Sequence, residues 1–560
     1  MIRPAERPTP ARVQSRQHPF WTDLPILFLA VLVLRVATAW LVATPGYMDA
    51  YYYYVGAARI ADGHGLTEPY LWNYLSQPLS LPAPAFRFWL PLTSFLLAPF
   101  LALFGSTFRA AQAPLIVLSS LIPLIAYVAS YQMAPIRRRA VRAALLTAVA
   151  PFYLHYWVVT DNFTPFALAG GLALLAMRAA LREARWRWYI VAGALVGLCS
   201  LTRADGPLLL IAFALVAFWP GAGTPAALPR RSAGWGAAAL TCLLVMAPWF
   251  LYQWIAVGSP TGGSGLQTAF LRSYDDLYAY GRSPTLGAYL AWGWPAILRS
   301  KLNAAGSNLL TVLAVFLSIF LAPLAAVEMW ARRREAMTRL VAGYLLLLFL
   351  IMTFVFTFPG PRGSLLHSGA ALLPFLLALA SGGLDRSVAW VAQRRKSWSA
   401  RQASDVLGIG ALALSLAMGG FLFERALVGS GPLQQAWNTR DDLYQAAGQW
   451  LSEQGIPMES PILVVDAPGF YYATGRPSLA LPNDPPDVAV AICRRFGASY
   501  LLLQKDHPQP LDGLYAGSET YPALTQAHEW KTSELEGKLF RCPPPVILTY
   551  SEESLPCQIP

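Results

Sequence analysis

The stretch LPILFLAVLVLRVATAWLVA (residues 24–43), followed directly by TPGYMDAYYYYVGAARIADGHGL (44–66), decides the fold class. Its first part is an apolar run of twenty residues, which is long enough for a helix to cross about 30 Å of hydrocarbon. Its second part turns polar and aromatic and places Asp49 close to the end of that helix. Apolar runs of similar length recur over the first three quarters of the chain. The sequence therefore predicts a mainly α, polytopic helical membrane protein.

Composition and charge agree with this class. Hydrophobic residues make up 56% of the 560 positions and charged residues only 13%, and the 19 Trp and 25 Tyr suit anchoring at a membrane surface. The net charge of +12 is uneven, because residues 424–560 contain 9 basic and 16 acidic residues and the rest of the chain is strongly basic. The basic residues lie in short loops between apolar runs, as the positive-inside rule predicts. We therefore expect the lipid bilayer as a partner and no nucleic acid.

The loop charges predict the topology. Hydropathy indicates twelve apolar segments, near residues 24–43, 89–105, 111–131, 140–159, 164–180, 188–203, 206–220, 234–256, 307–330, 340–358, 366–383 and 404–423. With a cytosolic N-terminus and twelve crossings, several arginine clusters would lie on the outer side, against the positive-inside rule. The segment 89–105 is short and contains Pro91 and Pro99, and leaving it uncrossed puts every cluster inside. We expect about eleven transmembrane helices in the plasma (inner) membrane, with an exoplasmic or periplasmic C-terminal region.

The chain divides into two predicted domains. Residues 1–423 form the transmembrane domain, whose first outer loop (44–110) carries juxtamembrane helices, and residues 424–560 form a small exoplasmic α/β domain. In the second domain TRDDLYQAAGQWLSEQG predicts an amphipathic helix, and SPILVVD and FGASYLLLQ predict strands. This domain has three cysteines, Cys493, Cys542 and Cys557. They allow at most one bridge, whose partners the sequence leaves open. No CxxC or HExxH spacing occurs, so no metal ligands are predicted.

Four stretches, in this order along the chain, carry a family resemblance. They are YYYVGAARIADGHGL, RFWLPLTSFLLAPFLALFG, RRRAVRAALLTAVAPFYLHYWVVTDNF and GALVGLCSLTRADGPLLL. Together they resemble the GT-C superfamily of integral-membrane glycosyltransferases, closest to protein O-mannosyltransferases and lipid A aminoarabinose transferases. The resemblance implies an inverting hexosyltransferase of mannosyltransferase type, which moves a sugar from a polyprenyl-phosphate-linked donor to an acceptor hydroxyl on the outer face. The sugar and the acceptor, which is a protein, a glycan or a lipid, stay open.

Asp49 and Asp161 are the predicted catalytic residues. The resemblance implies that the first-loop acid is the base. An acceptor hydroxyl must lose its proton to a nearby carboxylate, and an apolar, aromatic setting would raise the pKa of that carboxylate toward a useful value. As alternatives, Asp49 caps a helix that begins near Ala50, and Asp161 marks a second helix start. Many relatives carry Asp-Glu here, whereas Ala50 follows Asp49, so a divalent metal is possible but has no support in the sequence.

The donor phosphate needs cationic or polar partners on the outer side, where the positive-inside rule makes basic residues scarce. The candidates for donor-phosphate or substrate binding are Arg203, Tyr280, Arg282, Lys301, Arg362, His64 and Arg87, with His367 as a weaker one. Arg203 has a local ion pair with Asp205 as its alternative, and His64 a turn between two glycines. Arg35, in the middle of the first helix, needs a partner that the sequence does not name.

Three other functions stay open at this point. A secondary transporter would need polar residues deep in the bundle, and few besides Arg35 are visible. A non-catalytic, lipid-binding relative fits the alanine that follows Asp49. An oligosaccharyl- or phosphotransferase that acts on a lipid-linked substrate is the nearest enzymatic alternative.

Overall fold

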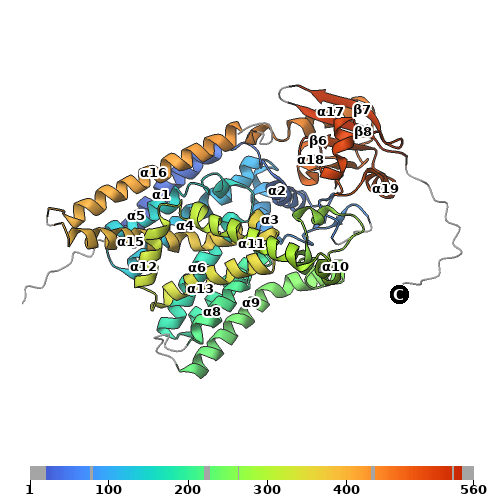
Figure 1. Ribbon diagram of the computed structural model, residues 1–560. Coiled ribbons are helices and arrows are strands. Elements are labelled where there is room, and N and C mark those ends of the chain that lie inside the picture. The colour runs from blue at the N-terminus through green and yellow to red at the C-terminus, as the bar shows by residue number, and fades with distance from the viewer. Residues whose placement is uncertain are drawn as a thin grey trace, which may run out of the picture.

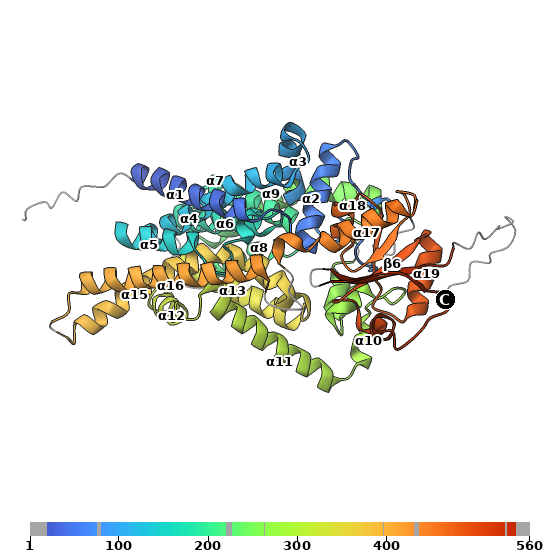
Figure 2. The ribbon, with the colours of Figure 1, turned by 90° about the horizontal axis from the view of Figure 1, so that it is seen from above.

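The computed structural model describes residues 20–75, 80–219, 227–262, 264–395, 397–429, 436–532 and 535–544. Within these residues a helical bundle carries a small α/β domain at one end (Figure 1). Seen at right angles, α1 (Phe20–Leu41) and α16 (Ala400–Val428) run along the bundle toward that domain (Figure 2). The predicted cytosolic N-terminus and Cys557, one of the three cysteines that could form the single predicted bridge, lie outside the described residues.

The bundle explains the apolar periodicity of the sequence. Besides α1 and α16 it contains α4 (Phe108–Met133), α5 (Arg137–Ala148), α6 (Phe163–Glu183), α7 (Trp186–Thr202), α8 (Leu208–Ala217), α9 (Leu228–Val257), α11 (Trp294–Leu310), α12 (Ala322–Ala331), α13 (Ala336–Phe354), α14 (Leu365–Gly369) and α15 (Leu373–Ala392). In the described part of the chain, seven helical segments are long and apolar enough to cross a membrane. Large apolar side chains such as Val33 and Val406 are exposed on the outer helices, as lipid contact requires. The predicted fold class is confirmed, and the count of eleven crossings stays a prediction.

Three of the predicted apolar segments are not continuous membrane-spanning helices. The segment 89–105 is α3 (Leu92–Phe104), whose 13 residues are too few to cross the hydrocarbon. In 140–159 the helix α5 ends at Ala148, and Pro151, two residues after its C-cap, prevents continuation. In 307–330 the chain passes from α11 into a π-helical turn and then breaks before α12. The break lies at Ser318 and Ile319, which both have positive φ.

The first outer loop lies between the bundle and the α/β domain. It contains α2 (Met48–Ala61), α3 and the short strands β1 (Thr67–Glu68), β2 (Tyr70–Leu71) and β3 (Ala83–Pro84). Helix α2 packs against α3 on one side and against α18 (Ala467–Thr474) of the C-terminal region on the other. The tyrosines of the run 51–54 are all buried, so this run is a packing surface and not a solvent-facing stripe.

The α/β domain is built around one six-stranded sheet. Its strand order is β2-β5-β4-β6-β8-β7, where β2, β5, β4 and β6 are parallel and the last two pairings are antiparallel. The strands of the C-terminal region are β4 (Ile462–Val464), β5 (Ser478–Ala480), β6 (Tyr500–Gln504), β7 (Thr525–Lys531) and β8 (Glu536–Arg541), and its helices are α17 (Asp442–Glu453), α18, α19 (Pro486–Phe496) and α20 (Asp512–Ala516). The predicted amphipathic helix is α17, and the two predicted strands are β4 and β6.

The sheet does not belong to the C-terminal region alone. Its edge strand β2 comes from the first outer loop and pairs with β5 through Tyr70–Ser478 and Leu71–Leu479. One apolar cluster also runs without interruption from α2 and α3 into α17, α18 and β6. The end of the bundle that carries α2 and α3 and the α/β domain therefore form a common core, and a site between them is held on both sides.

Candidate active site

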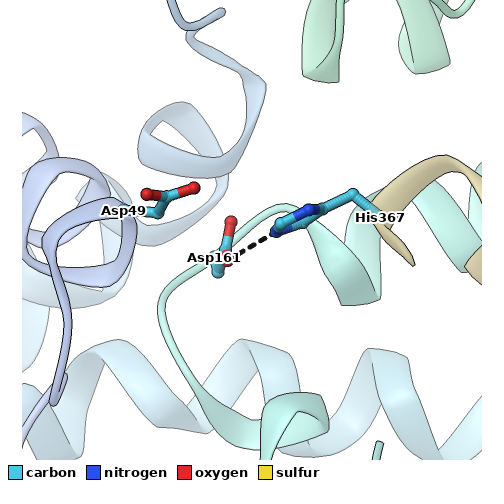
Figure 3. Close-up of side chains that lie close together, drawn as sticks. All are labelled: Asp49, Asp161 and His367. Atoms are coloured by element: carbon cyan, nitrogen blue, oxygen red, sulfur yellow. Dashed lines mark hydrogen bonds and ion pairs between the residues drawn. The ribbon is translucent and has the colours of Figure 1, made fainter. Parts of the chain in front are cut away.

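Asp49 lies at the N-terminus of a helix without capping it (Figure 3). Helix α2 begins at Met48, the N-cap position belongs to Tyr47, and Asp49 is in the first turn. The alternative that Asp49 caps a helix beginning at Ala50 is therefore wrong. The carboxylate of Asp49 therefore does not serve as the N-cap of α2. The N-terminus of the helix still favours a negative charge at this point.

Asp161 comes from a second helix start and points toward the same space (Figure 3). It directly precedes Asn162, the N-cap of α6, and its side chain is fully buried. The hydroxyl of Thr160 donates a 2.7 Å hydrogen bond to the carbonyl oxygen of Ala50, which ties the loop that carries Asp161 to the first turn of α2. Two acids that are 112 residues apart in the chain are thereby held side by side.

Three hydrogen bonds fix the Asp161 carboxylate. Tyr47 donates its hydroxyl to Oδ2 at 2.5 Å, and the backbone N–H of Asn162 donates to Oδ1 at 2.5 Å. The ring nitrogen Nε2 of His367 lies 2.9 Å from Oδ2. The other ring nitrogen, Nδ1, lies 2.8 Å from the carbonyl oxygen of Gly363, an atom that can only accept. The Gly363 contact therefore places a proton on Nδ1 and turns Nε2 toward the acids, where Nε2 donates to the carboxylate of Asp161 when it also carries a proton.

The surroundings give the two carboxyl groups different pKa values. Burial and, to a smaller extent, repulsion from Asp161 raise the pKa of Asp49 to about 7, although the charges of His367 and Arg203 act in the opposite direction. Burial also opposes ionisation of Asp161, but the charge and hydrogen bond of His367 and the hydrogen bond of Tyr47 outweigh it, so its pKa lies below the ordinary value. Asp49 can exchange a proton near neutral pH while Asp161 stays ionised, which is the division of roles expected of an acid–base pair.

The same three side chains could hold a divalent cation. One ligand atom from each of Asp49, Asp161 and His367 lies within 4.8 Å of the others. Carboxylate and imidazole ligands suit Mn²⁺, Zn²⁺ and related ions, and the Gly363 contact is the kind of outer hydrogen bond that orients a ligating histidine. The sequence predicted no metal ligands because the three residues are far apart in the chain, and that prediction stays untested.

A cavity of about 520 Å³ opens beside Asp49. Its polar and aromatic lining includes Asp49, Tyr53, Trp89, Asn162, Arg203, Asp205, Tyr274, Arg362, Ser364 and His367. Its apolar wall includes Phe88, Leu90, Leu208, Leu266, Leu277, Ile351, Met352 and Phe356. Asp161 lies behind this surface and reaches the cavity through its contact with His367. The cavity thus offers a reactive carboxylate, cationic groups and an apolar wall within one space.

The structure brings the candidates Arg203 and Arg362, and the weaker candidate His367, to the cavity together with Asp49. Nε of Arg203 donates to Asp205 at 3.1 Å and to the hydroxyl of Ser368 at 2.9 Å. The predicted local ion pair therefore exists, yet the terminal nitrogens of Arg203 have no partner among the described residues. The guanidinium of Arg362 is exposed and lies 5.0 Å from the ring of Tyr274. Both arginines can bind an anion without first losing an existing ion pair at those nitrogens.

Five other predicted binding residues do not line the cavity. Arg282 pairs with Asp484, and the hydroxyl of Tyr280 accepts a hydrogen bond from Arg495. Lys301 binds the carbonyl oxygen of Phe354 and the hydroxyl of Thr357. His64 is exposed between Gly63 and Gly65, whose positive φ values show the predicted turn. Arg87 is next to the lining residue Phe88 without belonging to the lining itself. The roles assigned to these residues stay predictions.

Arg35 finds an aromatic partner. Its side chain is fully buried in α1, and its guanidinium carbon lies 5.8 Å from the centre of the Trp157 ring. None of its three nitrogens has a hydrogen-bond partner among the described residues. Trp157 belongs to the short helix that precedes Asp161, so Arg35 lies beneath the loop that carries the second acid.

A second hollow, of about 680 Å³, lies away from the two acids. Its lining includes Arg59, Tyr471, Glu459 and Arg495. The nitrogens of Arg59 are bound by Thr67 and Tyr471, and Arg495 is bound by Tyr280. Its lining includes neither Asp49, Asp161 nor His367, so this hollow is separate from the candidate active site.

Several residues in or beside the cavity lining had no feature in the sequence strong enough to single them out. Asn162 follows Asp161 directly, and its amide donates to the hydroxyl of Tyr53 at 3.2 Å. Trp89 stacks on Trp72 with ring centres 4.0 Å apart. Ser368, next to His367, supports Arg203. In the sequence, the one indication that such a residue belongs to the site is a position next to a candidate acid or histidine. Asn162 and Ser368 have such a position, and Trp89 does not.

With this geometry established, we compared the chain with known proteins. The family model described as dolichyl-phosphate-mannose-protein mannosyltransferase matches residues 84–252. The structure is similar to ArnT from Cupriavidus metallidurans in the apo state, with 13% identity, coverage of 93% of this chain and 98% of that chain, and a TM-score of 0.57. The chain has the GT-C fold. No curated protein matches its sequence.

Two further structures with the GT-C fold come from Archaeoglobus fulgidus. The oligosaccharyltransferase AglB, solved with an inhibitory peptide and a dolichol-phosphate, is 14% identical, covers 86% of this chain with 69% of its own length, and has a TM-score of 0.56. The oligosaccharyltransferase tethered to an acceptor peptide with the NVT sequon is 15% identical, covers 93% of this chain with 74% of its own length, and has a TM-score of 0.57. The predicted resemblance to the GT-C superfamily is confirmed, and the family match includes Asp161 and Arg203 but begins after Asp49.

Proposed function

We propose that this protein is a membrane glycosyltransferase that transfers a sugar from a polyprenyl-phosphate-linked donor to an acceptor hydroxyl, with inversion at the anomeric carbon. The observation that carries the proposal is the position of Asp49. Its carboxyl group has a pKa of about 7 and lines a cavity that also contains Arg203 and Arg362. A base and an anion-binding site thus share one space, as a displacement that expels a phosphate requires.

The reaction consists of one displacement. The acceptor oxygen attacks the anomeric carbon, the bond from that carbon to the phosphate oxygen breaks, and the hydroxyl proton passes to the carboxylate of Asp49. A single displacement inverts the configuration at the attacked carbon. The raised pKa of Asp49 makes its carboxylate a stronger base than an ordinary aspartate. Asp161 stays ionised and, with Tyr47, keeps His367 oriented toward the reacting groups.

Arg203 and Arg362 stabilise the leaving lipid phosphate. Asp205 and Ser368 hold Arg203 at Nε and leave its terminal nitrogens for two parallel hydrogen bonds, which match the geometry of phosphate oxygens. Arg362, which lines the same cavity, adds a second positive charge. The apolar wall around Ile351 and Phe356 suits the first isoprene units of a lipid donor.

A divalent cation has suitable ligands in this site. Asp49, Asp161 and His367 would hold it. When bound, such an ion supplies positive charge that polarises a phosphate or stabilises the leaving group.

The comparisons support the lipid donor, and a disulfide in this chain supports the outer location. AglB was solved with a dolichol-phosphate, and the family model is that of enzymes that use dolichyl-phosphate-mannose. We place the α/β domain on the exoplasmic side because Cys493 and Cys542 form a disulfide, a bond that persists mainly in oxidising compartments. The sugar is unassigned, and a mannosyltransferase is one member of the proposed class.

The test uses purified protein in detergent and a labelled polyprenyl-phosphate sugar, with total membranes as the source of acceptor. Wild-type protein should release lipid phosphate and label an acceptor, and Asp49→Asn should do neither. Asp62→Asn is the matched control, because Asp62 is an exposed acid at the other end of the same helix. A transporter would instead carry substrate across proteoliposomes in the Asp49→Asn variant as well. Equal phosphate release by both aspartate variants would exclude the proposed base.

A further inference from the structure

Asp484 joins the α/β domain to the loop that contains the cavity-lining residues Tyr274 and Leu277. It lies in the PNDPPD stretch between β5 and α19, and its side chain is 5% exposed. Its Oδ2 accepts a hydrogen bond from the backbone N–H of Tyr280 at 2.8 Å, and its Oδ1 accepts one from Nη2 of Arg282 at 2.5 Å. Arg282 also donates to the carbonyl oxygen of Asn483 at 3.0 Å. A buried carboxylate with charge-assisted bonds to both sides of a turn is a strong and directional anchor.

The turn itself is built for this contact. Gly281, between the two donors, has φ of +71°, a conformation that other residues adopt only with strain. The left-handed residue reverses the chain so that the backbone of Tyr280 and the side chain of Arg282 reach one carboxylate. A second set of bonds surrounds the anchor, since Asn483 donates its N–H to the carbonyl oxygen of Tyr278 and Arg495 donates to the hydroxyl of Tyr280.

A few residues before the anchored turn, the loop reaches the part of the cavity that contains Arg362. Tyr274 and Leu277, in the short helix just before the turn, both line the cavity. The ring of Tyr274 lies 5.0 Å from the guanidinium of Arg362, which is exposed and has no other partner among the described residues. The first outer loop joins the same point, because Tyr74 donates its N–H to the carbonyl oxygen of Leu277.

We infer that Asp484 is a positioning residue through which the α/β domain holds Tyr274 beneath Arg362 and so sets the affinity of the site for the lipid phosphate. The inference rests on the proposed function for the identity of the ligand. Its physical basis is that Arg362 is a long, exposed side chain whose orientation depends on one aromatic contact. When Asp484 releases the turn, the loop loses the bonds that hold it to the α/β domain six residues after Tyr274, so the Tyr274 ring moves more freely and Arg362 samples many rotamers.

The test has a ligand-free part and a ligand-binding part. Hydrogen exchange of the full-length protein in detergent would be compared for wild type and Asp484→Asn, followed by the binding of undecaprenyl monophosphate to both. We expect exchange over residues 266–282 to become about tenfold faster, while exchange in β4 and β6 is unchanged. The Kd for undecaprenyl monophosphate should rise about fivefold, since one cation–π contact and one ordered arginine are lost.

Two more variants make the result specific. Asp487→Asn, three residues away, removes an exposed acid without a partner in the described part of the chain and should leave exchange and Kd unchanged. Arg282→Gln removes one arm of the anchor but keeps the bond from Tyr280, so it should give a smaller change of the same kind and serves if Asp484→Asn does not fold. Unchanged exchange in Asp484→Asn would overturn the anchor, and faster exchange with an unchanged Kd would overturn its role in phosphate binding. If wild-type protein does not bind the lipid phosphate at all, the proposed function fails, and the exchange measurement still decides the anchor.

Discussion

Replacement of Asp49 by asparagine should inactivate the protein and stabilise it at the same time. In the folded protein the pKa of Asp49 is about 7, against an ordinary value of 3.8. By linkage, this difference corresponds to about 4 kcal/mol of lost stability once the pH exceeds 7. Because the side chain lines a cavity that water can enter, we take this figure as an upper bound. Asparagine keeps the shape and removes the charge, so the variant avoids this cost.

The sign of the effect depends on pH. A carboxyl group whose pKa is raised on folding is neutral in the folded state and ionised in the unfolded state between the two pKa values, so stability falls as the pH rises from about 4 to about 7. Asp49→Asn should therefore melt close to the wild-type temperature near pH 4 and several degrees above it at pH 8. Activity follows the opposite trend, because the base must be ionised. The wild-type rate should rise about tenfold per pH unit below 7 and level off above it.

Both halves can be measured on the same samples. Melting would be followed by tryptophan fluorescence in detergent between pH 4 and pH 8.5, and activity by release of lipid phosphate from a labelled donor. The variant should lose at least about a hundredfold in rate, the usual contribution of a general base. Asp62→Asn should follow the wild type in both measurements. A rate that does not change between pH 5.5 and pH 8, or a variant that is no more stable than wild type at pH 8, would refute the assignment of Asp49 as a buried base.

Three further predictions concern the rest of the site and the domain. Arg203→Gln should weaken binding of undecaprenyl monophosphate by about 10- to 100-fold, the loss expected for charge-assisted hydrogen bonds to a phosphate, and isothermal titration in detergent would show whether affinity is instead unchanged. Addition of Mn²⁺ should move the midpoint of the wild-type pH profile below 7, because a cation between the two acids favours their ionised forms, and His367→Ala should remove that movement. A profile that Mn²⁺ leaves in place would argue against the cation site. Without reductant, Cys493 and Cys542 should resist a maleimide even after denaturation, and Cys493→Ser should cost about 4 kcal/mol of stability for a loop of 49 residues. Labelling of either cysteine in unreduced, denatured protein would contradict the disulfide.

The sequence predicted the helical class and the two acids, because these depend on local signals. An apolar run of twenty residues ends just before Asp49, and polar residues interrupt the chain again around Asp161. The break after α5 was missed because hydropathy averages over Pro151, which ends the helix in an otherwise apolar segment. The edge strand β2 was also missed, since two residues of a loop carry no periodic signal until the sheet is present.

Arg282 shows why the arginines could not be sorted from the sequence. Basic residues on the outer side need a reason, and an anionic donor was the one that the sequence offered. The structure provides Asp484 as a partner, 202 residues later in the chain, whereas Arg203 has a partner two residues away and yet keeps its terminal nitrogens free. Sequence distance therefore gives no guide to which cation is neutralised. The two arginines differ in location, because Arg203 lines the cavity beside Asp49 and Arg282 does not.

The alanine after Asp49 has a structural explanation. Ala50 is fully buried, and its carbonyl oxygen accepts the hydrogen bond from Thr160 that brings the second loop against α2. A glutamate at position 50 would place a charge in this packed contact. The second acid of the site comes instead from Asp161, one residue after Thr160, and the hydrogen bond from Thr160 to the Ala50 carbonyl oxygen brings Asp161 beside Asp49. Two acids from separate loops can then take different pKa values, because Tyr47 and His367 contact only one of them. A pair of adjacent acids on one helical turn would be harder to separate in this way.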